Sequence, residues 1–195
     1  MLAVDMQIET PRFLLRDFSE ADRWSFIDYQ MDPRYRSLYD LLGSDAGRAN
    51  DLFDLFSAWR RQNPRQNFQI GIFEGTTSRL CGCAGLRRAG KPEGTAVLGL
   101  ELTPNDWGRY GAAIEVGCAL IEYGFCTLRL HTITGDTASG NSRVEKLACW
   151  FEAFVVDRRE GPAWMRARGW QEVEWALPRD AWIASLARRR LLRTN

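Results

Sequence analysis

The sequence contains few of the residues that build a metal centre or a polyanion-binding surface. Histidine occurs once, at His131, and lysine occurs twice, so 24 of the 26 basic residues are arginines. Cys81 and Cys83 alternate on an expected strand and therefore point to the same face. Two thiols and one histidine fall short of the ligand set of a zinc site. We therefore expect no metal.

Net charge and long apolar runs are also scarce. A formal net charge of +1 gives no overall field for nucleic acid or an anionic membrane, so neither is expected as a partner. No stretch reaches the roughly 18 apolar residues of a membrane span. The opening MLAVDMQIETPR has acidic residues where a secretory leader has an apolar run, and the five cysteines are an odd number. These features predict a cytoplasmic protein with reduced thiols.

The composition that remains, 45% hydrophobic and 26% charged, is typical of a globular domain. Alternating apolar residues predict seven strands, and helical apolar stripes with a basic closing segment predict helices between and after them. We expect one α/β domain over residues 1–195, with a single mixed, mostly antiparallel central sheet of about six to seven strands flanked by helices. The expected strands are 12–18, 67–75, 79–89, 94–102, 131–136, 154–159 and 170–177.

Local signals place several helix ends and turns. Ser19 with Asp22 and Ser142 with Glu145 predict capping boxes at two helix starts. A further helix is expected from 45 to 63, and the Gly-Thr-Thr turn after residue 74 predicts a hairpin. On the helix after residue 111, Glu115 is expected to be solvated.

The segment LGLELTPNDWGRYGAAIEV, residues 98–116, runs from a strand into a helix through two glycines and an arginine. Free backbone N–H groups and the positive helix end at such a junction form an anion site, most often for phosphate. Gly108 and Gly111 permit a positive φ and close approach of a ligand, and Arg109 adds bidentate donors. The alternative, that the glycines serve only the turn, stays open at this point.

The same segment resembles the acetyl-CoA-binding motif of GNAT-type N-acetyltransferases, in particular their RimJ/RimL-like branch. That branch has roughly G-Y-x-L-x-P-x-x-W-G-K-G-Y-A-T-E-A. Arg109 stands in place of lysine, and Gly111-Ala112-Ala113 falls in register only if Tyr110 is an inserted residue. Without the insertion, Tyr110 takes the place of the central glycine of the pyrophosphate loop. The residues in register before that point are Gly99, Leu102, Pro104, Trp107 and Gly108.

Other segments resemble the same branch in the same order, so the resemblance covers most of the chain. IETPRFLLRDFSEAD is similar to its opening strand and helix, and RREGPAWMRARGWQEVEWALPRDAW to its closing strands. TASGNSRVEKLACWF is similar to N-x-x-S-x-R-V-x-E-K-L-G-F, with Asn141 nearest the family asparagine and no clear counterpart of the serine. The resemblance implies the GNAT (acyl-CoA N-acyltransferase) fold.

The resemblance also implies a reaction and a set of site residues. It implies transfer of an acetyl group from acetyl-CoA to a primary amine, on a protein N-terminus or a small molecule, by direct attack in a ternary complex. Glu101 and Asn141 are the catalytic candidates. The residues implied to bind acetyl-CoA are Leu102, Thr103, Trp107, Gly108, Arg109, Tyr110, Gly111, Ala112, Ala113 and Asn141.

The roles of the two catalytic candidates each have an alternative. Glu101 lies at the carboxyl end of the expected strand 94–102, next to the expected thioester, and could act as general base; it could equally be a solvated strand side chain. Asn141 could bind the pantetheine arm or order a water, or it could cap the following helix.

The acceptor pocket is expected between residues 31–63 and the last strands. Aromatic side chains that could line it are Tyr35, Tyr39, Trp59, Trp164 and Trp170. Eight tryptophans also suggest an aromatic surface, part of which could form a homodimer interface.

A second class of function stays open beside the enzyme. The altered loop from Trp107 to Ala113 and the missing serine favour a divergent, non-catalytic CoA-binding or interaction module of the same fold. Glu101, Arg109 and the helix start Gly111-Ala112-Ala113 favour the enzyme.

Overall fold

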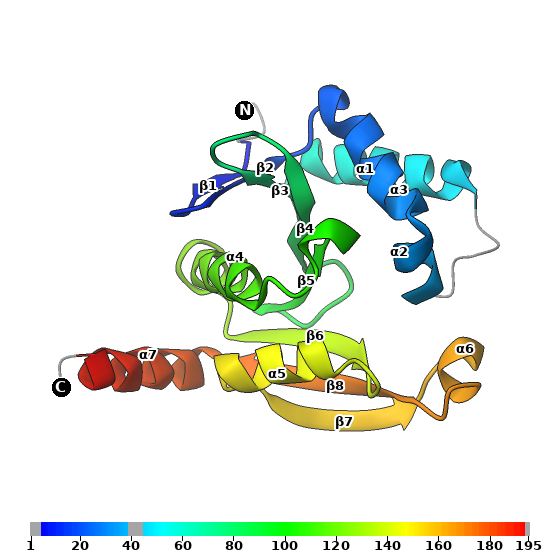
Figure 1. Ribbon diagram of the computed structural model, residues 1–195. Coiled ribbons are helices and arrows are strands. Elements are labelled where there is room, and N and C mark those ends of the chain that lie inside the picture. Colours follow the sequence, from blue (N-terminus) through cyan, green and yellow to red (C-terminus); the bar gives the residue numbers. More distant parts are fainter. Residues whose placement is uncertain (1–4, 39–44, 194–195) are drawn as a thin grey trace. The chain divides into compact units, whose positions relative to one another are not determined.

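The computed structural model describes residues 5–38 and 45–193 (Figure 1). By its internal contacts the chain divides into two compact units. The first unit comprises residues up to Ala89 together with Gly99–Leu120, and the second comprises Gly90–Leu98 and the residues from Ile121 onward. Tyr39, expected in the acceptor pocket, lies outside the described residues. The single domain over residues 1–195 remains a prediction.

The strands form a mixed, mostly antiparallel sheet, as predicted, but with eight strands in the order β1-β2-β3-β4-β5-β6-β8-β7. Strands β5 and β6 pair in parallel, over Thr95–Val97 of β5. The strand that was not predicted, β1, has three residues, too few for an alternating pattern, and pairs with β2. The strands are β1 (Gln7–Glu9), β2 (Phe13–Asp17), β3 (Asn67–Glu74), β4 (Leu80–Arg87), β5 (Thr95–Leu102), β6 (Thr132–Ala138), β7 (Phe154–Glu160) and β8 (Gln171–Pro178).

Side-chain caps set several helix starts. Asp45 accepts from the Gly47 and Arg48 amides at the start of α3. The prediction that Ser142 caps α5 was wrong: Asn141 is the N-cap, and its side chain accepts from the Val144 amide. The helices are α1 (Arg23–Met31), α2 (Pro33–Leu38), α3 (Ala46–Arg60), α4 (Tyr110–Glu122), α5 (Ser142–Phe151), α6 (Ala163–Arg166) and α7 (Arg179–Arg193); Tyr123–Thr127 continues α4 as a π-turn.

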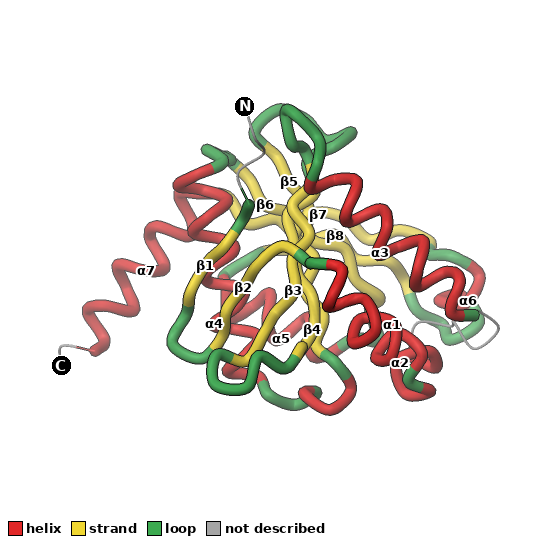
Figure 2. The backbone as a smooth tube through the Cα atoms, turned by 90° about the horizontal axis from the view of Figure 1, so that it is seen from above, coloured by secondary structure: helices red, strands yellow, loops and turns green. Residues whose placement is uncertain are grey.

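In the first unit, α1 and α3 cover one face of strands β2–β4, and α4 lies on the other face (Figures 1 and 2). An aromatic cluster fills the space under α1 and α3. Its buried members are Phe18, which directly follows β2, and residues of α1, α2, α3, β3 and β4; Trp59 and Trp107 pack against its edge. The edge-to-face and tilted ring pairs, such as Phe18 with Phe26 at 5.4 Å, add to the apolar area that they bury.

On the opposite face of the first unit, α4 is tied to the β1–β2 hairpin through Glu115. Its carboxylate accepts from the Thr10 hydroxyl at 2.6 Å and from the Arg12 amide and Nε at 2.9 and 2.6 Å. The expectation of a solvated Glu115 was therefore wrong. The partners lie more than a hundred residues away in the sequence, where a helical pattern gives no information about them.

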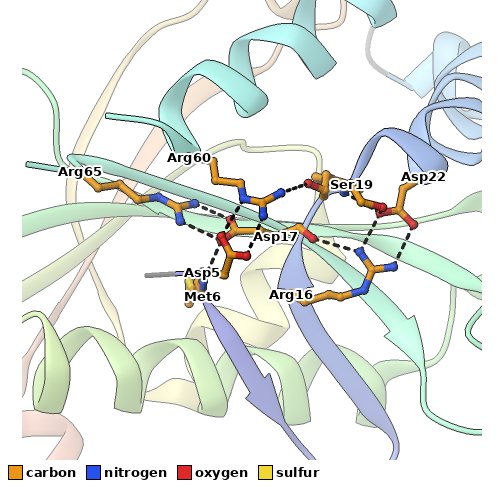
Figure 3. A network of polar contacts seen from close by, with 9 residues as sticks. Asp5, Met6, Arg16, Asp17, Ser19, Asp22, Arg60 and Arg65 are labelled. Atoms are coloured by element: carbon orange, nitrogen blue, oxygen red, sulfur yellow. Dashed lines mark hydrogen bonds and ion pairs between the residues drawn. The ribbon is translucent and has the colours of Figure 1, made fainter. Parts of the chain in front are cut away.

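A polar network fixes the beginning of the chain to the first unit (Figure 3). Arg65 forms two hydrogen bonds to the Asp17 carboxylate, at 2.9 and 2.6 Å, and both side chains are buried. The Asp17 carboxylate also accepts from the Met6 amide at 2.7 Å. Arg60 pairs with Asp5 in the same bidentate way. These contacts position β2 and therefore the strands that pair with it.

In the second unit, β6, β8 and β7 form an antiparallel ladder, and α5 packs on β8. Ala148 of α5 is buried against Val173 and Trp175 of β8. On the same ladder, Arg159 of β7 pairs with four carboxylates, those of Asp136, Asp157, Glu172 and Glu174. Because Arg159 is exposed, this cluster contributes little to stability.

Candidate active site

The carboxyl end of β5 is fixed by a close approach to Gly82 of β4. A Cβ atom at this position would lie 2.1 Å from the Glu101 carbonyl oxygen, and Gly82 has a φ of +153°. Only glycine can occupy position 82 without moving the backbone. The Thr103 amide then donates to the Cys81 carbonyl at 2.8 Å. The close approach to Gly82 and the Thr103–Cys81 hydrogen bond therefore fix the backbone at and after Glu101 against β4.

The Glu101 side chain lies among four neutral hydrogen-bond donors in the first unit. Its Oε1 accepts from Tyr29 Oη at 2.6 Å, Gln30 Nε2 at 3.0 Å and Cys83 Sγ at 3.2 Å. Its Oε2 accepts from Tyr35 Oη at 2.9 Å. Glu101 is therefore not the solvated strand side chain of the alternative interpretation. It is a carboxylate with a fixed orientation at the end of a strand.

Burial controls the protonation of the donors around Glu101. Burial raises the pKa of the Tyr29 hydroxyl well above its usual value, and the neighbouring Cys83 and Glu101 raise that pKa further. Burial likewise raises the pKa of the Cys83 thiol, with Glu101 as the next cause. Both groups therefore remain protonated at neutral pH and act as donors to the carboxylate.

The turn after β5 (Pro104–Asp106) is built around the buried Asp106 carboxylate. Arg79 donates to it twice, at 2.7 and 2.9 Å, Arg109 once at 2.6 Å, and the Thr103 hydroxyl at 2.8 Å. Burial alone would raise the pKa of Asp106, but the hydrogen bonds from Arg79, Arg109 and Thr103 outweigh it and lower the pKa to about 2. Four hydrogen bonds thus hold the Asp106 carboxylate inside the turn.

The chain enters α4 through Gly108, which has a φ of +88°. Trp107 before it packs against the aromatic cluster and donates its Nε1–H to the Leu102 carbonyl at 2.9 Å. The helix begins at Tyr110, so Gly111-Ala112-Ala113 lies in its first turn. Tyr110 and Gly111 are exposed there, whereas Ala112 is buried. The predicted cofactor residues from Leu102 to Ala113 thus lie on one continuous segment of the first unit, with Leu102, Thr103 and Ala112 buried.

Part of the hydrogen-bonding capacity of this loop is used internally. The Arg109 amide donates to the Asp106 carbonyl, and the Ala112 and Ala113 amides donate to the Arg109 carbonyl. The Arg109 guanidinium, paired with Asp106, also lies 3.7 Å from Glu74. Arg12 adds a second guanidinium, 3.5 Å from where a Cβ at Gly111 would lie. The charge next to the helix start thus comes from two paired arginines.

Asn141 belongs to the second unit and is described there alone. Its Oδ1 accepts from the Val144 amide at 3.4 Å, a long hydrogen bond, and its own amide donates to the Ala138 carbonyl. This is the capping role of the alternative interpretation.

The residues expected to line the acceptor pocket belong to two units. Tyr35 and Trp59 lie in the first unit, and Tyr35 contacts Glu101. Trp164 and Trp170 lie in the second, with their rings packed edge to face at 6.3 Å.

Of the residues that surround the two carboxylates, sequence reasoning named Tyr35, Thr103 and Arg109 and missed the others. Tyr29, Gln30 and Cys83 contact Glu101, but Tyr29 lies 72 positions before it. Arg79 and Asp106 were not candidates either. The local signal that could have found Asp106 is its position three residues after Thr103 in a turn that begins with proline, a spacing that favours side-chain bonding.

Metal-ligand clusters and membrane-spanning helices are both absent from the described residues. Over residues 5–38 and 45–193, no three His, Cys, Asp or Glu side chains are grouped so that they could hold a metal ion. Over the same ranges, no helix has both the length and the apolar character needed to cross a membrane.

Comparisons with known proteins agree with the geometry. A family model described as "Acetyltransferase (GNAT) domain" matches residues 12–151. The Bacillus licheniformis protein "Uncharacterized N-acetyltransferase p20" is 27% identical over 139 residues, which cover 71% of this chain and 76% of that protein.

Solved structures are similar at lower identity. A GNAT-family acetyltransferase from Bacillus anthracis has a TM-score of 0.70 and 18% identity over 89% of this chain and 98% of its own. A Vibrio cholerae protein described as a ribosomal-protein-serine acetyltransferase has a TM-score of 0.68 and 19% identity, over 91% of this chain and 99% of its own. A spermidine N-acetyltransferase chimera that includes Vibrio cholerae sequence has a TM-score of 0.70 and 14% identity, over 88% of this chain and 98% of its own. The structural similarity shows the fold. Because the family model matches residues 12–151, most of the chain, the chain belongs to the GNAT acetyltransferase family.

Proposed function

We propose that the protein is an N-acetyltransferase that transfers the acetyl group of acetyl-CoA to a primary amine by direct attack in a ternary complex. The observation that carries this proposal is the Glu101 carboxylate. It lies at the carboxyl end of β5, has a fixed orientation and accepts hydrogen bonds from neutral donors. Without a cationic partner among these contacts, such a carboxylate can take a proton from an incoming ammonium group.

The chemistry of the first unit fits an anionic cofactor. We assign binding of acetyl-CoA in this unit to Leu102, Thr103 and the residues from Trp107 to Ala113; for Asn141, in the second unit, binding of acetyl-CoA stays a prediction from the resemblance. The start of the 13-residue helix α4 carries a positive dipole end, and the exposed Gly111 leaves its backbone accessible. Acetyl-CoA supplies the acetyl group activated as a thioester.

The proposed reaction balances with Glu101 as the base. One ammonium proton moves to the Glu101 carboxylate, and the nitrogen lone pair forms a bond to the thioester carbon. The C–S bond breaks with its electron pair on sulfur, which takes the second proton from nitrogen. Deprotonating an α-amino group near pH 7 costs about 1.4 kcal/mol, against about 4.6 kcal/mol for a lysine side chain. A single carboxylate is therefore better suited to the α-amino group of a protein N-terminus or to a small amine of low pKa.

The finer assignments rest on the resemblance and on the named relatives. The segment from 98 to 116 and the Vibrio cholerae protein described as a ribosomal-protein-serine acetyltransferase support the RimJ/RimL-like branch and a protein N-terminus as acceptor. The spermidine N-acetyltransferase chimera supports a small amine. A cytoplasmic location, one domain over the whole chain and a homodimer remain predictions.

Calorimetric titration of acetyl-CoA tests the cofactor site. Gly111→Glu would place a carboxylate in the proposed anion site, whereas Gly111→Ala adds only a Cβ with 3.5 Å of room to Arg12. We expect micromolar binding by the wild type and by Gly111→Ala, and none by Gly111→Glu. Failure of the folded wild type to bind would favour the non-catalytic interaction module instead.

An acceptor screen completes the test. The probes are a short peptide with an N-terminal serine, the same peptide with a blocked N-terminus and a free lysine, and spermidine. Release of the CoA thiol, measured with a thiol reagent, gives the rate for each probe.

A further inference from the structure

The donors around Glu101 are unevenly divided between its two oxygens. Three donors, from Tyr29, Gln30 and Cys83, converge on Oε1. Among the described residues, Tyr35 alone donates to Oε2, at 2.9 Å. A carboxylate offers about four lone-pair sites, two on each oxygen. Oε1 is therefore saturated, and Oε2 keeps one site for a further donor.

A second hydrogen-bond acceptor lies beside this carboxylate without a donor. Gln30 is 3% exposed, and its Oε1 has no hydrogen-bond partner in the part of the chain that the structure describes. The same amide group donates through Nε2 to Glu101, so its oxygen is close to the carboxylate. A buried acceptor without a donor is unfavourable, because it has lost its hydrogen bonds to water. A ligand that brings N–H groups would remove that penalty.

We infer that Tyr29, Gln30 and Tyr35 are positioning residues that orient Glu101 so that its Oε2, together with Gln30 Oε1, receives the amine of the acceptor. This inference rests on the proposed function and names the atoms that carry it. The proton from the acceptor ammonium moves to Glu101 Oε2 and leaves the lone pair on nitrogen. Oε1 stays bonded to Tyr29 throughout.

The arrangement also defines which acceptors fit. A primary ammonium has three N–H donors, so it can bond to Oε2 and to Gln30 Oε1 at the same time. A hydroxyl of the same size has one donor and leaves one of the two oxygens without a partner. Sites that bond a ligand through buried polar groups discriminate strongly against an analogue that lacks a donor. Primary amines are therefore favoured over alcohols.

The groups that face Glu101 come from several packed elements. From α1 and β4 these are Tyr29 and Cys83, which burial keeps neutral. From α2 the facing group is Tyr35. Arg87 of β4 lies beside Gly99, two residues before Glu101 on the same face of β5. Asp32 before α2 is paired with Arg34. Among the described residues, every side chain that donates to Glu101 is therefore uncharged.

The test compares Tyr29→Phe and Tyr35→Phe with Tyr123→Phe, which makes the same change outside the cluster. Removing a donor leaves the carboxylate less firmly oriented. We expect kcat to fall in the first two variants while the KM for acetyl-CoA is unchanged. We expect kcat to fall about tenfold in Tyr29→Phe, because Oε1 loses its shortest bond. Tyr123→Phe should match the wild type in both measurements.

Gln30→Met tests the second acceptor separately. It should raise the KM for the acceptor about tenfold while the KM for acetyl-CoA is unchanged. Melting curves establish that each variant is folded; if Tyr29→Phe does not fold, Tyr35→Phe carries the test.

The possible failures differ. A wild type that acetylates no probe overturns the proposed function and this inference together. An active wild type whose Tyr29→Phe and Tyr35→Phe variants keep the kcat of Tyr123→Phe overturns only the positioning roles.

Discussion

Glu101 and Asp106 are carboxylates five residues apart in the first unit, and their surroundings differ in charge. Glu101 accepts from two tyrosines, a glutamine amide and a thiol, all of them neutral. Asp106 accepts from two arginines and a threonine hydroxyl. Both side chains have fixed orientations, so the difference between them lies in charge and not in order.

That difference fits the proposed role of Glu101, because Asp106 alone of the two is paired with cations. Two guanidiniums lower the pKa of Asp106 to about 2, so it stays ionised at any pH where the protein would work. Neutral donors fix the orientation of Glu101 without neutralising its charge. The same residue class thus gives a candidate base at the end of β5 and a structural anion in the turn that follows.

The largest effect expected from this comparison is on turnover. Glu101→Gln removes the proton acceptor but keeps the shape, and kcat should fall by about 10²–10⁴. Stability should change little, because Tyr35 can accept from the new amide while Tyr29 still donates to its oxygen. Initial rates at saturating acetyl-CoA and a melting curve check both parts. A kcat within about threefold of the wild type would remove Glu101 as the base.

Asp106→Asn should show the opposite pattern, a large loss of stability. The amide would place an N–H group against the guanidiniums of Arg79 and Arg109. These side chains are 43% and 38% exposed and can be hydrated, so the free energy of unfolding should fall by about 2–3 kcal/mol, less than for a fully buried pair. For a chain of this size the melting temperature should fall by about 6 °C. Urea unfolding measures the change; Glu101→Gln serves as the control.

The pH dependence of stability sharpens the comparison further. The folded pKa of Asp106, about 2, is below its usual value of 3.8, so its contribution is present above pH 3.8 and is lost as pH falls through about 2. The contribution is about 2 kcal/mol. The difference in unfolding free energy between the wild type and Asp106→Asn should therefore shrink by about that amount from pH 5 to pH 2. A constant difference would mean that Asp106 is not held by charge.

Sequence alone predicts what local patterns determine. Alternation along β3 and β4, the start of α3 near Asp45 and the strand-to-helix segment from 98 to 116 are each determined by neighbouring residues. The GNAT family and fold follow from several such segments in order. Glu101 could be proposed as a base for the same reason, because its place at a strand end is a local property.

The rest depends on contacts between residues far apart in the sequence. Strand β1 exists because β2 pairs with it, not because of its own three residues. Glu115 was expected in water and instead binds Arg12, and Glu101 is oriented by Tyr29, 72 positions away. Asn141 and Ser142 are both good caps, and the local pattern did not show which of the two starts α5.

The smallest expected effect concerns the backbone of the loop next to Asp106. Gly108 has a φ of +88°, and no atom of the described residues lies within 4 Å of the place that a Cβ would take there. Gly108→Ala therefore adds backbone strain without a clash, about 1 kcal/mol. Gly111 lies inside α4, where Gly→Ala stabilises by about 0.5–1 kcal/mol. Urea unfolding should therefore give changes of opposite sign for two identical substitutions three residues apart. If Gly108→Ala is neutral, the turn adapts, and the arginines around Asp106 do not hold it rigidly.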